Sequence, residues 1–162
     1  MTKRRYSEQS FPSYVFIPGQ NPHPKKEGGH MEGKSEPIAA PLDLEHPETS
    51  PEFCYGIDLF NHRYYWESHV YFEALWNAHR RHGVVADFLK ALIKLSAAGV
   101  KNNLLQPDSV QGHYHRAIDL LEDIKLKEGA DFLGFNLNQL LGEIRNILNT
   151  HSGEIFLHPS WD

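Results

Sequence analysis

The fold is decided by residues 65–76, which read YWESHVYFEALW. At about 100° per residue in an α-helix, most of the aromatic side chains in this stretch fall on one arc around His69. Apolar residues that recur every three to four positions are typical of an amphipathic helix and not of a strand. We therefore expect a helix that extends from about residue 64 to about residue 81 and stops before Gly83.

Four further segments carry the same kind of helical signal. Ser50-Pro51-Glu52 combines an N-cap serine, a first-turn proline and an early acid, which is typical of a helix start. No stretch alternates apolar and polar residues over the length of a strand. The expected helices cover about residues 51–61, 64–81, 85–102, 107–129 and 137–148. The sequence thus predicts an all-α fold, a compact array of about five helices.

The first 50 residues have a different composition. Eight of the ten prolines lie within residues 1–51, and proline at that density excludes a helix or a central strand. Residues 14–17 nevertheless form an apolar run before Pro18-Gly19, which a disordered linker rarely carries. We expect residues 1–50 to be an irregular proline-rich arm packed on the helices and not an independent domain. Residues 51–162 are expected to form a single helical domain with a C-terminal tail.

Charge and composition exclude several classes of function. The 16 basic and 21 acidic residues give a formal net charge of −5, and no basic block suggests a nucleic-acid partner. The most apolar stretch, residues 91–100, is about half as long as a membrane span. A single cysteine, Cys54, excludes an intrachain disulfide. Because no apolar leader follows Met1, we expect a cytoplasmic protein that binds neither nucleic acid nor membrane.

The candidate chemical site is a histidine and a carboxylate on the helix quoted above. His69 lies in the middle of the apolar arc, and Glu73 lies one turn on, about 40° away. His113 is expected on the inward side of the fourth helix, so these three side chains can converge in the core. Imidazole and carboxylate are ligands for Zn, Fe or Mn as divalent ions. On the arm, His23 and His30 are further candidate ligands.

Two hypotheses account for the pair formed by His69 and Glu73. In the first, a buried pocket binds a divalent metal or a small polar ligand, and Glu73 is a ligand or the general base of a hydrolase. In the second, the pair is a core hydrogen-bond network in a non-enzymatic structural or interaction module, for example a homo-oligomer. Glu67 projects about 160° away from His69, so we expect a surface acid or a partner for the arm.

The same helical stretch resembles the family labelled domain of unknown function 309 (DUF309). The family signature reads roughly Y-F/W-E-A-H-E-x-x-E-x-x-W and is followed by a G-L-I-x-L-A-A run. The first block is matched by Tyr65, Glu67, His69, Glu73 and Trp76, and the second block corresponds to residues 88–98. Val70 stands where the signature has an acid, so this chain lacks any chemistry that needs that acid.

The arm adds to this resemblance. Its Pro18-Gly19, Pro22-His23-Pro24 and Gly29-His30 motifs are similar to the N-terminal extension of one branch of the family. Together the similar parts cover about residues 14–30 and 56–121. The resemblance implies a compact helical fold, and it implies no activity.

Overall fold

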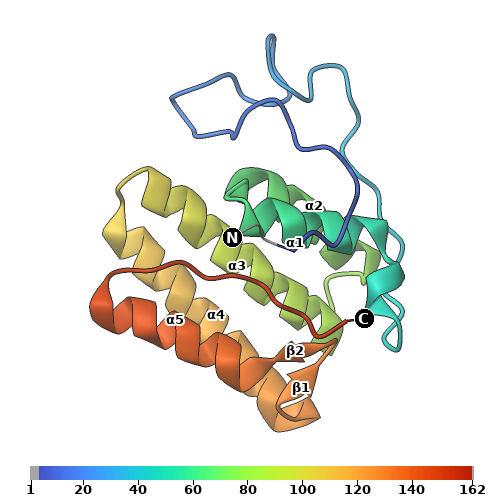
Figure 1. Ribbon diagram of the computed structural model, residues 1–162, viewed down its shortest axis with the longest axis vertical. Coiled ribbons are helices and arrows are strands. Elements are labelled where there is room, and N and C mark those ends of the chain that lie inside the picture. Colours follow the sequence, from blue (N-terminus) through green and yellow to red (C-terminus); the bar gives the residue numbers. More distant parts are fainter. Residues whose placement is uncertain (1–3, 162) are drawn as a thin grey trace.

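Helices form nearly all of the regular structure in the computed structural model, which describes residues 4–161 (Figure 1). Their bounds are α1 Pro51–Asn61, α2 Tyr65–Ala78, α3 Val84–Asn103, α4 Pro107–Glu128 and α5 Leu137–Thr150. Two minor elements are a 3-10 turn, η1 Pro47–Thr49, and an antiparallel hairpin of β1 Asp131–Phe132 with β2 Phe135–Asn136. The predicted all-α fold of five helices is confirmed. The hairpin escaped prediction because two-residue strands leave no periodicity in a sequence.

The helix ends follow the capping chemistry of the sequence. Ser50 caps α1, because its side chain accepts a hydrogen bond from the Phe53 amide at 3.2 Å. Asn136 caps α5 in the same way. The predicted end of α2 near residue 81 is wrong by three residues, because Arg80 and Arg81 adopt left-handed φ angles of 59° and 57° after Ala78.

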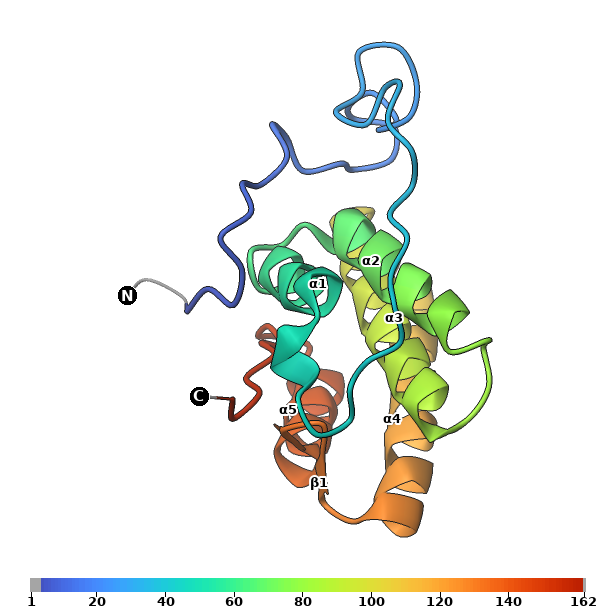
Figure 2. The same ribbon diagram turned by 90° about the vertical axis from the view of Figure 1, so that its right-hand side faces the viewer.

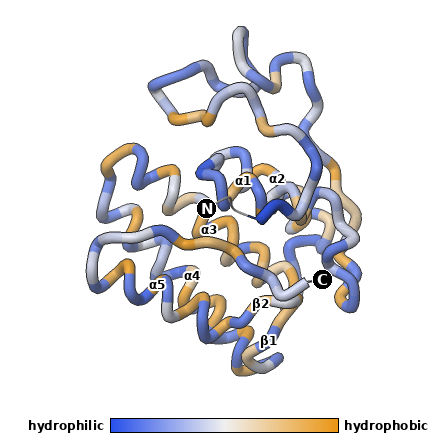
Figure 3. The backbone as a smooth tube through the Cα atoms, viewed as in Figure 1, coloured by the Kyte–Doolittle hydropathy of each residue, from blue (hydrophilic) through white to orange (hydrophobic). Residues whose placement is uncertain are grey.

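Consecutive helices pack on one another, α1 on α2, α2 on α3, α3 on α4 and α4 on α5 (Figure 2). Apolar residues occur along all five helices (Figure 3), and the core between them is rich in phenylalanine and leucine. Its largest fully buried side chains include Phe53, Phe72, Phe88, Leu95 and Leu121. None of the described helices combines the length and the apolar character that crossing a membrane would require.

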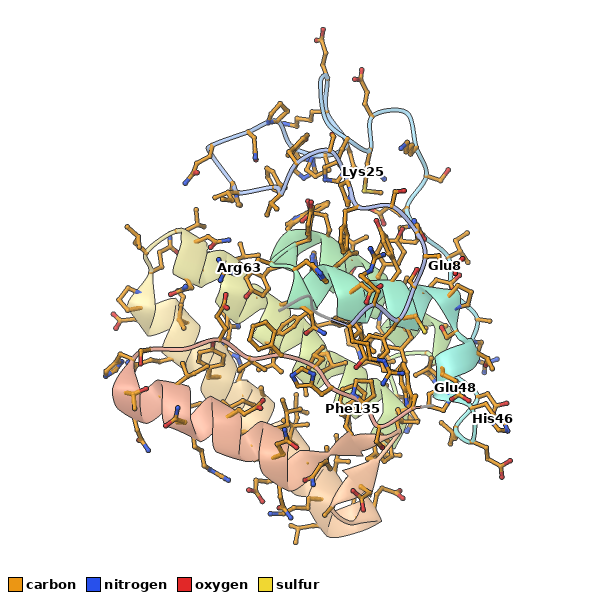
Figure 4. All side chains as sticks on the ribbon, in the orientation of Figure 1. Glu8, Lys25, His46, Glu48, Arg63 and Phe135 are labelled. Carbon is orange, nitrogen blue, oxygen red and sulfur yellow. The ribbon has the colours of Figure 1, made fainter. Side chains whose placement is uncertain are left out.

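The N-terminal arm lies against α1 and α2, and the C-terminal tail lies against α1 and the hairpin. The C-terminal tail crosses the helices as an extended segment (Figure 1). Asn61 holds it, because the Asn61 side chain accepts from the Leu157 amide at 2.7 Å and donates to the Leu157 carbonyl at 2.9 Å. The N-terminal arm forms turns and extended stretches from Arg4 to His46, with no helix or strand. Its outer loop carries Lys25, and side chains fill the space between that loop and the helices (Figure 4).

Candidate functional site

Glu67 is the buried carboxylate of α2. It lies in the first turn of the helix and its side chain is only 3% exposed, because the arm covers this face. Glu67 Oε2 accepts hydrogen bonds from the Phe16 amide at 2.9 Å and from His30 Nε2 at 2.8 Å. The expectation of a surface acid is therefore wrong, and the other expectation for Glu67, a partner for the arm, describes the observed contacts.

The second oxygen of this carboxylate is unsatisfied. Glu67 Oε1 is buried and has no hydrogen-bond partner among the described residues. The Glu67 residue also lines a cavity of about 90 Å³ between the arm and the first two helices. The arm contributes His30, Met31 and Lys34 to its lining, α1 contributes Tyr55, and α2 contributes Glu67 and Val70. That volume exceeds what one water needs, so the cavity can hold a small molecule.

His30 is brought to Glu67 by a tightly folded loop. The Met31 amide donates to the Pro24 carbonyl at 2.7 Å, which closes the loop. A Cβ at Gly29 would overlap the carbonyl oxygens of His23 and Pro24, so only glycine fits there. Burial is nearly complete for the His30 side chain, which is 6% exposed. The loop thus positions the imidazole of His30 against the Glu67 carboxylate.

The other arm histidine, His23, lies in an aromatic cluster. Its ring lies 5.3 Å from that of Phe16 and 5.4 Å from that of Trp66, both in edge-on orientations. Phe16 and Trp66 complete the triangle at 5.3 Å. Such edge-to-face contacts stabilise packing, and here they hold the arm on the first turn of α2.

His69 and Glu73 lie on the flank of α2 and not in the core. Their side chains are 31% and 46% exposed, and His69 Nε2 lies 3.3 Å from Glu73 Oε2. The predicted burial is wrong because the inward face is not centred on the arc around His69, although Phe72 belongs to both. That face carries Ser68, Phe72 and Leu75. It is rotated about 100° from the arc predicted around His69.

Close packing explains this rotation. Ser68 Oγ lies 2.9 Å from Ser96 Oγ of α3, and both residues are fully buried. A small side chain at position 68 allows the two helices to approach each other, and the hydroxyl pair satisfies both polar groups. His69 and Glu67 consequently fall on opposite flanks of the helix, and the arm covers the flank that carries Glu67.

His113 does not join the other candidate ligands. Its Nδ1 accepts a hydrogen bond from Arg116 at 3.3 Å. Burial, together with the charges of Arg116, Lys94 and Lys101, lowers the pKa of His113 below its ordinary value. Within residues 4–161, no three His, Cys, Asp or Glu side chains are grouped as a metal site requires. The predicted convergence of His69, Glu73 and His113 is therefore not observed.

Val70 separates two shallow sites on α2. It lines the cavity beside Glu67, and it also lines a second cavity of about 100 Å³ that includes His69 and Glu73. The position that departs from the family signature thus lies on the wall of both cavities. With an apolar wall at this point, Glu67 is the only carboxylate among the described residues that line the first cavity.

A second buried carboxylate, Asp58, was not among the predicted site residues. It is fully buried in α1, and it accepts hydrogen bonds from Arg5 Nε at 2.7 Å, the Tyr6 amide at 2.8 Å and the Ser7 amide at 2.9 Å. The signal that could have identified it is an acid within the run of apolar residues in α1, because such an acid needs a partner. Asp58 attaches the beginning of the arm, as Glu67 attaches its outer loop.

Comparison with known proteins identifies one family. Residues 53–112 match the family described as "Domain of unknown function (DUF309)". The match begins in α1 and ends in α4, so it includes Asp58 and Glu67, while His30 and the rest of the arm lie outside it. Neither the curated proteins nor the solved structures contain a significant match to the chain.

Proposed function

We propose that this chain, whose residues 53–112 belong to the DUF309 family, is a small-ligand-binding protein with its site in the cavity beside Glu67. The observation that carries the proposal is Glu67 Oε1, a buried carboxylate oxygen with no partner among the described residues. Leaving such an acceptor unpaired costs about 1–3 kcal/mol, and more for a charged group. A ligand with a hydrogen-bond donor would remove that cost.

The arm acts as the cover of the site. Because Glu67 Oε1 is itself buried, a ligand reaches it only when the arm moves away from α2. Residues 4–46 form only turns and extended segments, and segments without regular structure open at a lower free energy than packed helices. The contacts from Phe16 and His30 to Glu67 Oε2 then close the arm over the bound ligand.

The donor set favours binding of a small polar ligand over a divalent metal or a hydrolytic step. A catalytic zinc site uses three protein ligands, whereas Glu67 Oε1 is one oxygen beside an apolar wall formed by Val70. The remaining candidate, His30, already directs Nε2 to Glu67 Oε2. Metal binding by His30 and Glu67, alone or with His69 and Glu73, is therefore an alternative outcome of the experiment.

The test uses the full chain labelled with ¹⁵N and a panel of probes added one at a time: methylammonium chloride, glycine, sodium acetate, sodium phosphate and zinc chloride. The amide of Phe16 reports on the site, because it donates to the Glu67 carboxylate. At least one probe is expected to shift this amide signal saturably in the wild type and not in Glu67→Gln.

Glu73→Gln is the matched control, since it alters a carboxylate on the same helix that is about half exposed and lies outside the lining of this cavity. This variant should respond as the wild type does. The proposal is overturned if no probe moves the Phe16 amide, or if Glu67→Gln and the wild type respond equally.

A further inference from the structure

The free oxygen of Glu67 restricts the chemistry of the ligand. A carboxylate oxygen only accepts hydrogen bonds, so the ligand must direct an N–H or O–H group at Oε1. The strongest hydrogen bonds to a carboxylate come from charged donors. An ammonium group supplies both a positive charge and three N–H donors. It therefore complements a buried carboxylate oxygen better than a neutral amide or hydroxyl does.

The walls of the cavity also suit a cation that carries apolar atoms. Tyr55 and Tyr71 both line the cavity, and the centroids of their rings lie 5.0 Å apart in an edge-on arrangement. The face of a tyrosine ring attracts an ammonium group. Burial is the main cause that raises the pKa of both hydroxyls, so the rings stay neutral. Leu59 and Val70 supply apolar contacts for a carbon skeleton.

The size of the cavity suits a small ligand. Its volume of about 90 Å³ is several times the roughly 10–15 Å³ that one buried water needs. Lys34 is the one cation on the solvent-exposed side of the lining, where its ammonium group can pair with a carboxylate at the outer end of a ligand.

We infer that the ligand of this site is a small primary ammonium compound, with its N–H groups directed at Glu67 Oε1 and its other end toward Lys34. This inference rests on the proposed function, because it names the ligand class of the same cavity. Two sources share this chemistry, a free alkylamine and a small amino acid, and they differ in whether a carboxylate meets Lys34.

The experiment measures dissociation constants for methylammonium, glycine, acetate and zinc chloride by ¹⁵N titration of the full chain, with the Phe16 amide as the reporter. Methylammonium, glycine or both should bind, and acetate should not. Glu67→Gln should weaken the binding by about tenfold or more, as expected for loss of a charge-assisted hydrogen bond. Glu73→Gln should leave it within about twofold.

Lys34→Met distinguishes the two sources. If the ligand is an amino acid, this variant weakens glycine binding and leaves methylammonium unchanged or tighter. If the ligand is a free amine, methylammonium binds more tightly than glycine in the wild type, and Lys34→Met strengthens it. Lys34 is exposed, so the variant is expected to fold, which the unchanged amide signals of α3 and α4 would verify.

The outcomes separate the two proposals. If acetate or zinc shifts the Phe16 amide in a manner that depends on Glu67, while methylammonium and glycine do not, the ammonium inference is wrong and the proposed binding site stands. If neither these four probes nor sodium phosphate shifts this amide, both are wrong. Equal binding of methylammonium to the wild type and Glu67→Gln also overturns the inference.

Discussion

Asp58 and Glu67 are two buried carboxylates that attach the same arm, and they differ in how completely they are satisfied. Asp58 receives three donors spread over both oxygens, one of them from the guanidinium of Arg5. Glu67 receives two donors on Oε2 and none on Oε1. A fully paired buried carboxylate needs no explanation beyond attachment. A half-paired one in the lining of a cavity is the observation on which the proposed ligand site rests.

The largest expected effect comes from Asp58→Asn. Both oxygens of Asp58 already face N–H donors, so an amide NH₂ in either place meets a donor, and the guanidinium of Arg5 loses the carboxylate of its ion pair. The free energy of unfolding should fall by about 3 kcal/mol, the lower end of the range for a broken buried ion pair. Urea denaturation measures this fall.

Glu8→Gln is the control for this experiment, because Glu8 is an exposed acid of the same part of the arm. Its effect should stay within about 0.5 kcal/mol, as for other surface substitutions. A loss for Asp58→Asn no larger than that of the control would show that Asp58 is not the anchor of the arm.

Gly29→Ala should have the next largest effect, at the loop that carries His30. A Cβ there overlaps two backbone carbonyls, and relief of such overpacking costs about 1–3 kcal/mol. At Gly28 the nearest atom to an added Cβ is Pro22 Cγ at 3.8 Å, and the cost is only that of its φ of 80°. Amide exchange of Phe16 should therefore accelerate more in Gly29→Ala than in Gly28→Ala. Equal exchange in the two variants would mean that the loop does not position His30.

Glu67→Gln should change stability far less than Asp58→Asn. A glutamine carbonyl can replace Oε2 as the acceptor for Phe16 and His30, and its NH₂ group then takes the place of an oxygen that faces no donor. We expect a change within about 1 kcal/mol in the free energy of unfolding. A loss as large as that of Asp58→Asn would contradict the distinction between the two carboxylates and identify Glu67 as a purely structural anchor.

The helices could be predicted from the sequence because their signals are local. The Ser50 cap, the first-turn prolines and the apolar periodicity all lie within the segment that they describe. The rotation of α2 about its axis was not predictable in the same way. It depends on Ser68 meeting Ser96, a contact between two small residues that carry little weight in a periodicity dominated by aromatic side chains.

The site was predicted only in part, for a related reason. His30 was predicted as a candidate metal ligand on the arm, and in the structure its hydrogen-bond partner is Glu67, which lies 37 positions further along the chain. Nothing in a helical projection shows which flank of α2 a separate segment will cover. The choice between Glu67 and Glu73 therefore required the path of the arm, and that path depends on tertiary contacts to Asp58 and Glu67.

The smallest expected effect concerns a third attachment of the N-terminal segment, in which the acceptor is neutral. His79 Nε2 accepts the Leu42 amide at 2.9 Å, and burial lowers the pKa of His79 below its ordinary 6.5. Below pH 6.5 the His79 of the unfolded chain binds a proton more readily than that of the folded chain. The stability that this contact contributes is therefore fully present above pH 6.5. It is lost as pH falls through 6.5 toward the folded pKa.

The Leu42 amide signal should consequently move as pH falls below 6.5, together with the His79 imidazole, because a protonated ring no longer accepts. In His79→Gln the Leu42 amide should not titrate in this range, and His46→Gln, at an exposed position of the same segment, should behave as the wild type. At Asp58 and Glu67 the acceptor is a carboxylate and not a neutral imidazole. The amide signal of Tyr6, which donates to Asp58, should therefore not shift as His79 is protonated. A His79 midpoint above 6.5 would show that this contact is not the buried acceptor described.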